Sequence, residues 1–249
     1  MIETKELSGR RALITGSAAG IGRAMAETLA EAGASVVCHG LDNVAATAAD
    51  WRARGLDVCE SRADLSRKDG VKTLQADITA WGQPDILVLN ASVETLQTWA
   101  DVDDAALDGQ SRVNIDATVR LIQAFLPAMI EQGWGRVIAI GTVQEARPQP
   151  RHFIYAATKA AQTNMILNLA RQGLHGHVTF NIVKPGAIPT DRNRATLDDP
   201  VARQATIDRI PLRRLGAPGD CAGVVRLLCS QAGAYINGAE ISVDGGLRL

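Results

Sequence analysis

Short apolar runs alternate along the chain with longer stretches in which apolar residues recur at helical spacing. The apolar runs occupy Ala12–Thr15, Ser35–His39, Asp57–Glu60, Ile86–Asn90, Arg136–Gly141, Val178–Val183 and Ala239–Val243. Runs of this length, rich in aliphatic and β-branched residues, predict β-strands, and the amphipathic stretches between them predict crossover helices. The pattern therefore predicts a parallel sheet of about seven strands.

Two of these runs, at 85–89 and 136–140, are almost wholly apolar. Strands of this kind are typical of a sheet that helices cover on both sides. The predicted fold class is therefore α/β, a doubly wound Rossmann-type parallel sheet with helices on both faces. Because no repeat, low-complexity tract or linker divides the chain, we expect one domain over residues 1–249. The polar, proline-containing stretch Pro185–Arg214 is predicted to be irregular, with residues 186–214 forming a lid beside the site.

The first crossover helix is predicted over Gly20–Ala32. Its apolar face would consist of Ile21, Met25, Ala26 and Leu29. Gly33 can adopt the left-handed conformation that ends a helix. The glycine-rich segment Gly16–Gly22 then lies between the first strand and this helix. Glycines permit a tight turn and a close backbone approach, and the helix N-terminus attracts a pyrophosphate. Such a segment is often only a turn, and the spacing alone does not decide between the two.

Composition and charge narrow the classes of function. The chain has 26 Lys and Arg residues against 27 Asp and Glu residues, a net charge of -1, which argues against a nucleic-acid partner. No apolar run approaches the roughly 20 residues of a membrane span, and the N-terminus lacks the basic-then-apolar order of a signal peptide. We therefore expect a cytoplasmic protein with no membrane partner.

Cysteines and histidines carry no predicted metal or redox role. The four cysteines form no CxxC pair, and three of them lie in apolar stretches, where a small buried thiol is common. His175 and His177 lie close together, but a third ligand is missing near them. The sequence predicts no metal and no disulfide.

Tyr155 and Lys159 are spaced so that they share one side of a helix, one turn apart. A phenol with a pKa near 10 is a reluctant base, and a neighbouring ammonium favours the phenolate. The pair can therefore move a proton to and from an alcohol oxygen. Surface helices also carry Tyr-x-x-x-Lys by chance, so the pair needs further support.

That support is the order of the other motifs along the chain. The segments concerned are Thr15–Gly22, Asp64-Leu65, Asn90-Ala91-Ser92, Asn114, Thr142, Tyr155–Lys159, Lys184–Thr190 and Ile241–Gly246. In this order and spacing they resemble the classical short-chain dehydrogenase/reductase family, over about Leu7 to Gly246. Two positions depart from its pattern, since Ser92 stands where the family has glycine and Thr142 where it ordinarily has serine.

The resemblance implies a nicotinamide-dependent oxidoreductase of alcohols and ketones. The implied catalytic residues are Asn114, Thr142, Tyr155 and Lys159, where Tyr155 moves the proton, Lys159 tunes it, Thr142 orients the carbonyl and Asn114 supports a water relay to the lysine. The implied cofactor-binding residues are Gly16, Ser17, Gly20, Ile21, Gly22, Asp64, Leu65, Asn90, Ala91, Tyr155, Lys159, Pro185, Gly186 and Ile188. The family commonly builds its subunit interface from the last strand and the helix beside it, so a homo-oligomer, a tetramer or dimer, is also implied.

The cofactor's 2′ group stays open between NAD(H) and NADP(H). An acidic residue that would bind the adenosine ribose is expected about 20 positions after the glycines, near Gly40, and Asp42 comes two residues later. Neither Ala19 nor Leu41 supplies a basic group for a 2′-phosphate.

Substrate specificity in such a fold lies in the loop after Thr142 and in the lid. Both are polar, and the candidate contacts are Gln144, Arg147, Arg151 and Arg192. We expect a small polar hydroxy or keto compound, such as a sugar, polyol or hydroxy acid, with one arginine on an anionic group. For any single arginine, exposure to water or a surface ion pair is the commoner situation.

Two other functions are compatible with the same fold. A dinucleotide-binding sensor or assembly subunit without catalysis is suggested by Ser92 and Thr142. An epimerase or dehydratase would use the ketone only transiently. Binding without turnover would identify the first, and product analysis the second.

Overall fold

The seven strands of the computed structural model, which describes residues 5–173, 176–191 and 193–249, form one parallel sheet. The strands are β1 (Arg11–Ile14), β2 (Ser35–His39), β3 (Val58–Ser61), β4 (Ile86–Leu89), β5 (Gly135–Ile140), β6 (Val178–Pro185) and β7 (Glu240–Val243). Their order is β3-β2-β1-β4-β5-β6-β7, and every neighbouring pair is parallel. The predicted doubly wound sheet is confirmed, with strand ends within two residues of the expected ones.

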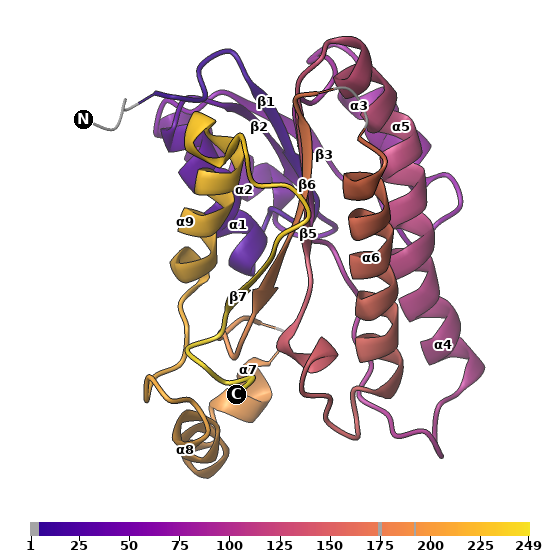
Figure 1. Ribbon diagram of the computed structural model, residues 1–249, viewed down its shortest axis with the longest axis vertical. Coiled ribbons are helices and arrows are strands. Elements are labelled where there is room, and N and C mark those ends of the chain that lie inside the picture. Colours follow the sequence, from indigo (N-terminus) through magenta and orange to yellow (C-terminus); the bar gives the residue numbers. More distant parts are fainter. Residues whose placement is uncertain (1–4, 174–175, 192) are drawn as a thin grey trace.

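Helices cover both faces of the sheet (Figure 1). The longer helices are α1 (Gly20–Glu31), α2 (Val44–Ala53), α3 (Gly70–Asp77), α4 (Asp104–Ser111), α5 (Ala117–Glu131), α6 (Phe153–Arg171), α8 (Pro200–Asp208) and α9 (Pro218–Cys229). Helices α1, α2 and α9 pack on one face around Met25 and Trp51, and α3, α5 and α6 pack on the other around Phe125 and Phe180. The apolar strands are therefore shielded on both sides, as their sequence predicts.

Helix α1 ends as the sequence predicts, since Gly33 has a φ of +98° just beyond it. The backbone N–H groups at the helix end are therefore turned back on the last turn. The helical stretch after β4 is interrupted by a π-helical turn, Arg112–Asp116, between α4 and α5. Such π-turns are frequent at functional sites, and this one contains Asn114.

Residues Asp104–Glu131 together form a helix that is long and apolar enough, by length and composition alone, to cross a membrane. The sequence pattern predicts a long helical segment here, over Asp104–Gln132, without predicting a membrane span. In the fold, Leu121, Phe125 and Met129 of this helix are buried in the core beside the sheet. A core helix of a soluble protein passes the same length test, so its burial explains its apolar character.

The prediction that the lid segment is irregular is wrong, because it contains two helices. Helix α7 (Arg194–Leu197) and helix α8 lie in it. Helix α8 starts with Pro200 directly after Asp199, whose carboxylate accepts from the Val201 N–H. No residue of α8 is buried. The helix therefore has no apolar face, and its sequence lacks the apolar periodicity from which helices are predicted.

Candidate active site

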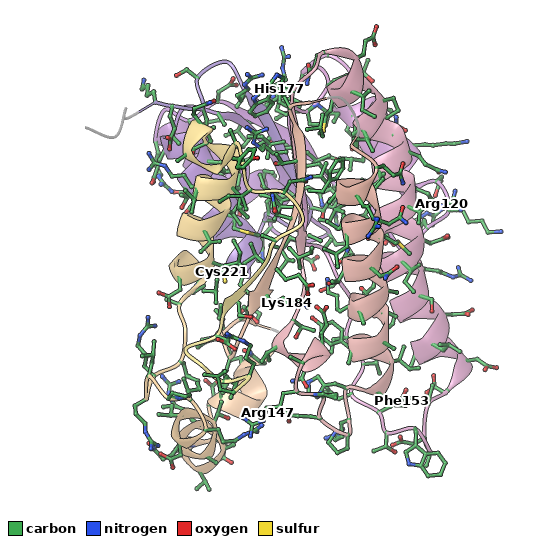
Figure 2. All side chains as sticks on the ribbon, in the orientation of Figure 1. Arg120, Arg147, Phe153, His177, Lys184 and Cys221 are labelled. Atoms are coloured by element: carbon green, nitrogen blue, oxygen red, sulfur yellow. The ribbon has the colours of Figure 1, made fainter. Side chains whose placement is uncertain are left out.

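A cavity of about 1000 Å³ lies at the carboxyl ends of the strands, where ligands bind in open α/β sheets. Of the residues expected to bind a cofactor, it is lined by Gly16, Gly20, Ile21, Gly22, Asp64, Leu65, Asn90, Ala91, Tyr155, Lys159, Pro185, Gly186 and Ile188. Ser17 is buried outside the lining, where its hydroxyl donates to Val37 O at 2.8 Å and accepts from the His39 N–H. His177 lies at the opposite end of β6 from Lys184 (Figure 2), far from this cavity.

The glycine turn between β1 and α1 fits a dinucleotide. Gly16 and Gly20 have φ values of +71° and +57°, which side chains rarely allow. A Cβ on Gly22 would lie 2.3 Å from Gly16 O, so only glycine lets the helix start this close to the turn. The N-cap residue of α1, Ala19, gives no side-chain cap. The first N–H groups of α1 are therefore available to an anion such as a pyrophosphate.

His39 holds the turn from the side of β2. Its Nδ1 accepts from the Gly16 N–H at 2.9 Å, and its Nε2 lies 3.1 Å from Ala63 O. Because Nδ1 is an acceptor, the ring proton is on Nε2, which donates to Ala63 O. Burial lowers the pKa of His39 to about 4, although the Ala63 carbonyl and Asp77 act in the opposite direction. A neutral imidazole thus joins the ends of β1, β2 and β3, a role that the sequence pattern did not indicate.

Asn90 and Thr15 join the ends of β4 and β1 beside the turn. The Asn90 amide donates to Thr15 O at 2.8 Å, and the Thr15 hydroxyl accepts from the N–H groups of Asn90 and Ala91, both at 3.0 Å. These bonds fix the backbone that faces the cavity. Ser92, which departs from the family's glycine, also lines the cavity.

The far end of the cavity is closed by the segment after β3. Asp64 accepts from the side chain and the backbone N–H of Ser66, and these bonds lower the pKa of its carboxyl group. Two residues before it, Arg62 donates from Nε to Leu41 O at 2.6 Å. A guanidinium therefore lies beside Leu41, just after β2, although Arg62 itself does not line the cavity. The sequence pattern indicated no basic group there, because Arg62 belongs to the segment after β3.

Tyr155 and Lys159 lie on α6 and face the cavity together. Lys159 is only 1% exposed, and its ammonium donates to Ile140 O at 2.6 Å and to Gln162 Oε1 at 2.9 Å. Two protein acceptors thus compensate the ammonium for its lost hydration. Both side chains therefore line one cavity from neighbouring turns of the same helix.

Thr142 follows β5 and lines the cavity with Tyr155. Its hydroxyl accepts from the Gln144 N–H at 3.3 Å, and its own N–H donates to Glu145 Oε1 at 2.9 Å. Glu145 in turn forms an ion pair with Lys184 at 2.9 Å. The pair ties the loop after β5 to β6 and so holds the threonine in place.

Asn114 is fully buried in the π-turn but does not line the cavity. Its side-chain oxygen accepts from the Val93 N–H, and its amide donates to Val93 O and to Thr158 Oγ1, at 2.9 to 3.0 Å. Its backbone oxygen accepts from the Thr118 hydroxyl. The side chain thus fixes the segment after β4 against α6.

The expected substrate contacts separate into three groups. Gln144 and Arg151 line the cavity, and Arg151 also donates to Leu96 O. Arg147 does not line it, because its guanidinium donates to Leu247 O and Leu249 O and holds the chain end (Figure 2). Arg192 lies outside the described residues.

Glu94 and Arg209, which the sequence did not indicate, and His152, which belongs to the polar loop after Thr142, complete the substrate end. His152 Nε2 lies 3.1 Å from Glu94 Oε1, both residues line the cavity, and the His152 ring lies 6.3 Å from that of Tyr155. Arg209 of the loop after α8 and Leu247 close the opposite side. No group of three or more His, Cys, Asp or Glu residues able to hold a metal ion occurs in the described parts of the chain.

Comparison with known proteins gives matches over nearly the whole chain. The model of the family described as enoyl-(acyl carrier protein) reductase matches residues 16–248. Nodulation protein G of Azospirillum brasilense is 34% identical over 97% of this chain and 99% of its own length.

Two solved structures are similar in sequence and fold. The 3-oxoacyl-(acyl-carrier-protein) reductase of Agrobacterium tumefaciens C58, with NADP bound, is 37% identical with a TM-score of 0.90, covering 98% of this chain and 96% of that one. The gluconate 5-dehydrogenase of Burkholderia cenocepacia J2315, in complex with NADP and tartrate, is 32% identical with a TM-score of 0.91, covering 98% and 97%.

Proposed function

The chain belongs to the short-chain dehydrogenase/reductase family, and from that premise we propose that it interconverts a secondary alcohol and a ketone on a small polar substrate. It is an NAD(P)-dependent oxidoreductase by family. The observation that carries the proposal is that Thr142, Tyr155 and Lys159 line the same cavity as the glycine turn. The fourth proposed catalytic residue is Asn114, which lies outside the cavity lining and holds the Val93 backbone and the Thr158 hydroxyl.

Residues of the protein bind the reacting oxygen of the substrate and move its proton. The cofactor, when bound, supplies or accepts a hydride at its nicotinamide ring. In reduction, the Tyr155 phenol gives its proton to the carbonyl oxygen, and in oxidation it takes the proton of the alcohol. The buried ammonium of Lys159 favours the phenolate that the second direction needs. The Thr142 hydroxyl holds the reacting oxygen beside the phenol.

NADP(H) is the proposed cofactor of this chain. Similar enzymes of Agrobacterium and Burkholderia were crystallised with NADP. No carboxylate lines the cavity at the end of β2, where Gly40 and Leu41 stand, so a 2′-phosphate meets no repulsion there. The Arg62 guanidinium, bound to Leu41 O at 2.6 Å, supplies the positive charge.

Arg62→Ala is therefore expected to weaken NADPH binding about tenfold, the size of one lost hydrogen bond between charged groups. The affinity for NADH should stay within about twofold. Isothermal titration calorimetry of the protein with each nucleotide measures both affinities. Arg67→Ala is the matched control, since Arg67 is exposed on the same segment and pairs with Asp69. Equal loss for both nucleotides in Arg62→Ala contradicts the assignment.

A hydroxy or keto acid is the proposed substrate class. The substrate end carries Glu94, Gln144, Arg151, His152 and Arg209 around the cavity. These groups can bind the hydroxyl groups of a polar substrate, beside the apolar side chains of Leu96, Leu197 and Leu247 in the same lining. Glu94 is already paired with His152, whereas in the described residues no ion pair is found for Arg209. Arg209 can therefore bind a carboxylate.

Arg209→Gln is expected to raise the KM of a hydroxy acid about tenfold and to leave that of the corresponding neutral polyol unchanged. Steady-state kinetics with gluconate against sorbitol, and with tartrate against threitol, measure the difference. Arg203→Gln on helix α8 is the control, because Arg203 is exposed and outside the cavity lining. A parallel rise for acid and polyol would exclude a carboxylate contact at Arg209.

A homo-oligomer, a tetramer or dimer, is also proposed, as is a cytoplasmic location. The family commonly forms oligomers, which supports the first proposal. Light scattering on the purified protein measures the oligomeric state, and a monomeric mass would contradict the first proposal.

A further inference from the structure

A chain of buried side chains runs from Lys159 into the interior, away from the cavity. The Lys159 ammonium donates to Gln162 Oε1 at 2.9 Å, and Gln162 Nε2 donates to the Thr118 hydroxyl at 2.7 Å. The hydroxyl donates to Asn114 O at 3.0 Å. Each of these residues is at most 2% exposed. This series of hydrogen bonds thus links α6 to α5 and to the π-turn.

The direction of these bonds is fixed by their chemistry. An ammonium only donates, so the group of Gln162 that faces Lys159 is its oxygen. Its amide nitrogen then faces Thr118, whose hydroxyl accepts this bond because its proton is used on Asn114 O. A reversed amide would bring two donors together at Lys159. The arrangement therefore admits one orientation of Gln162.

The consequence for Lys159 is electrostatic. Away from water, the charged form of a lysine is favoured only while acceptors compensate it. Ile140 O and Gln162 Oε1 are such acceptors of Lys159, at 2.6 and 2.9 Å. The first belongs to the backbone of β5 and is present whatever the side chains are. The second depends on Gln162, and its position depends on Thr118.

We propose that Gln162, anchored by Thr118, is a positioning residue that keeps the Lys159 ammonium charged and directed toward Tyr155. Gln162 and Thr118 thereby link Lys159 to the backbone oxygen of Asn114. The inference rests on the proposed function, since it concerns how the phenol of Tyr155 is tuned.

Besides Tyr155 and Lys159, the titratable groups that line the cavity are His39, Asp64, Glu94, Arg151, His152, Asp191 and Arg209, and two carboxylates on the segments that flank Tyr155 have partners of their own. Glu145, after β5, is paired with Lys184 of β6 at 2.9 Å, and Glu94, after β4, is paired with His152 at 3.1 Å. Each pair is common to all the variants below. A change in the ionisation of Tyr155 on substituting Gln162 is therefore assigned to Lys159.

The chain allows this ionisation to be read without turnover. It contains two tyrosines, Tyr155 and Tyr235, and Tyr235 is fully exposed. In a Tyr235→Phe protein the phenolate absorbance as a function of pH reports Tyr155 alone. In this background, Gln162→Leu is expected to move the titration midpoint upward by about one pH unit, because the ammonium loses one acceptor.

Variants of Thr118 and Thr163 complete the experiment. Thr118→Val should move the midpoint in the same direction by less, and Thr118→Ser, which restores the hydroxyl, should return it. Thr118→Val also keeps the test available if Gln162→Leu does not fold. Thr163→Val is the matched control on the same helix, since the buried Thr163 hydroxyl has no partner among the described residues, and its midpoint should not move.

Unchanged midpoints in both Gln162→Leu and Thr118→Val overturn the proposal. An equal shift in Thr163→Val does so too, because it would reflect general loosening of α6. The proposed function is tested separately in the same Tyr235→Phe protein, by nucleotide titration and turnover. If both fail while the Tyr155 midpoint still responds to Gln162, the positioning role stands and the dehydrogenase assignment fails.

Discussion

Tyr155→Phe is expected to lower kcat by a factor of about 10²–10⁴ in both reaction directions, the usual contribution of a positioned acid or base. The substitution removes the phenol oxygen and keeps the ring, which is 7% exposed and packed beside His152. Packing is therefore preserved, and NADPH affinity should change by less than about twofold. Stopped-flow or steady-state absorbance of reduced nucleotide gives kcat, and a binding titration gives the affinity.

Tyr235→Phe is the control for this variant. It makes the same chemical change on a fully exposed tyrosine outside the cavity, so its kcat should equal that of the unmodified protein. Turnover by Tyr155→Phe within about tenfold of the unmodified rate would mean that another group moves the proton. Nucleotide binding without turnover by the unmodified protein would favour the sensor or assembly subunit.

His39 is expected to make stability fall steeply as the pH is lowered below neutrality. Its pKa is lowered in the fold from 6.5 to about 4 by burial, so between these values the unfolded chain takes up a proton that the folded chain does not. The unfolded state binds more protons, and stability therefore decreases as the pH falls from about 6.5 to about 4. The full loss is about 3 kcal/mol for this group.

His39→Gln isolates this contribution. Glutamine keeps an oxygen that can accept from Gly16 N–H but has no group that titrates in this range. Urea unfolding at pH 7.5, 6, 5 and 4.5 gives the free energy of unfolding of both proteins, with every other titrating group in common. The difference between them should change by about 2.5 kcal/mol in favour of the variant between pH 7.5 and 4.5, because pH 4.5 is still above the folded pKa of about 4. Parallel curves would show that His39 takes up its proton equally in both states.

The sheet and its site could be predicted from local patterns. Strands such as β4 and β5 are apolar throughout, since helices cover both faces, and their boundaries were predicted within two residues. The glycine turn and the Tyr155–Lys159 pair depend on short-range spacing, so their approximate places in the fold followed from the sequence.

The remaining parts depend on long-range packing. Gln162 meets Thr118 across 44 positions, and Arg62 meets Leu41 across 21; no local pattern indicates either contact. The sequence around His39 indicates only a buried strand, because its partners Gly16 and Ala63 follow the other strands β1 and β3. Helix α8 buries no residue, so it lacks the apolar stripe by which a helix is recognised.

The central claim is that one cavity holds the dinucleotide with its reactive ring against Tyr155 and Thr142. A crystal structure of the protein with NADP⁺ tests it most directly. The account predicts the pyrophosphate at the N-terminus of α1, the 2′-phosphate beside Arg62, and the nicotinamide between Tyr155 and the Pro185–Ile188 segment. A nucleotide bound outside this cavity, or a phenol oxygen turned away from the nicotinamide, would contradict it.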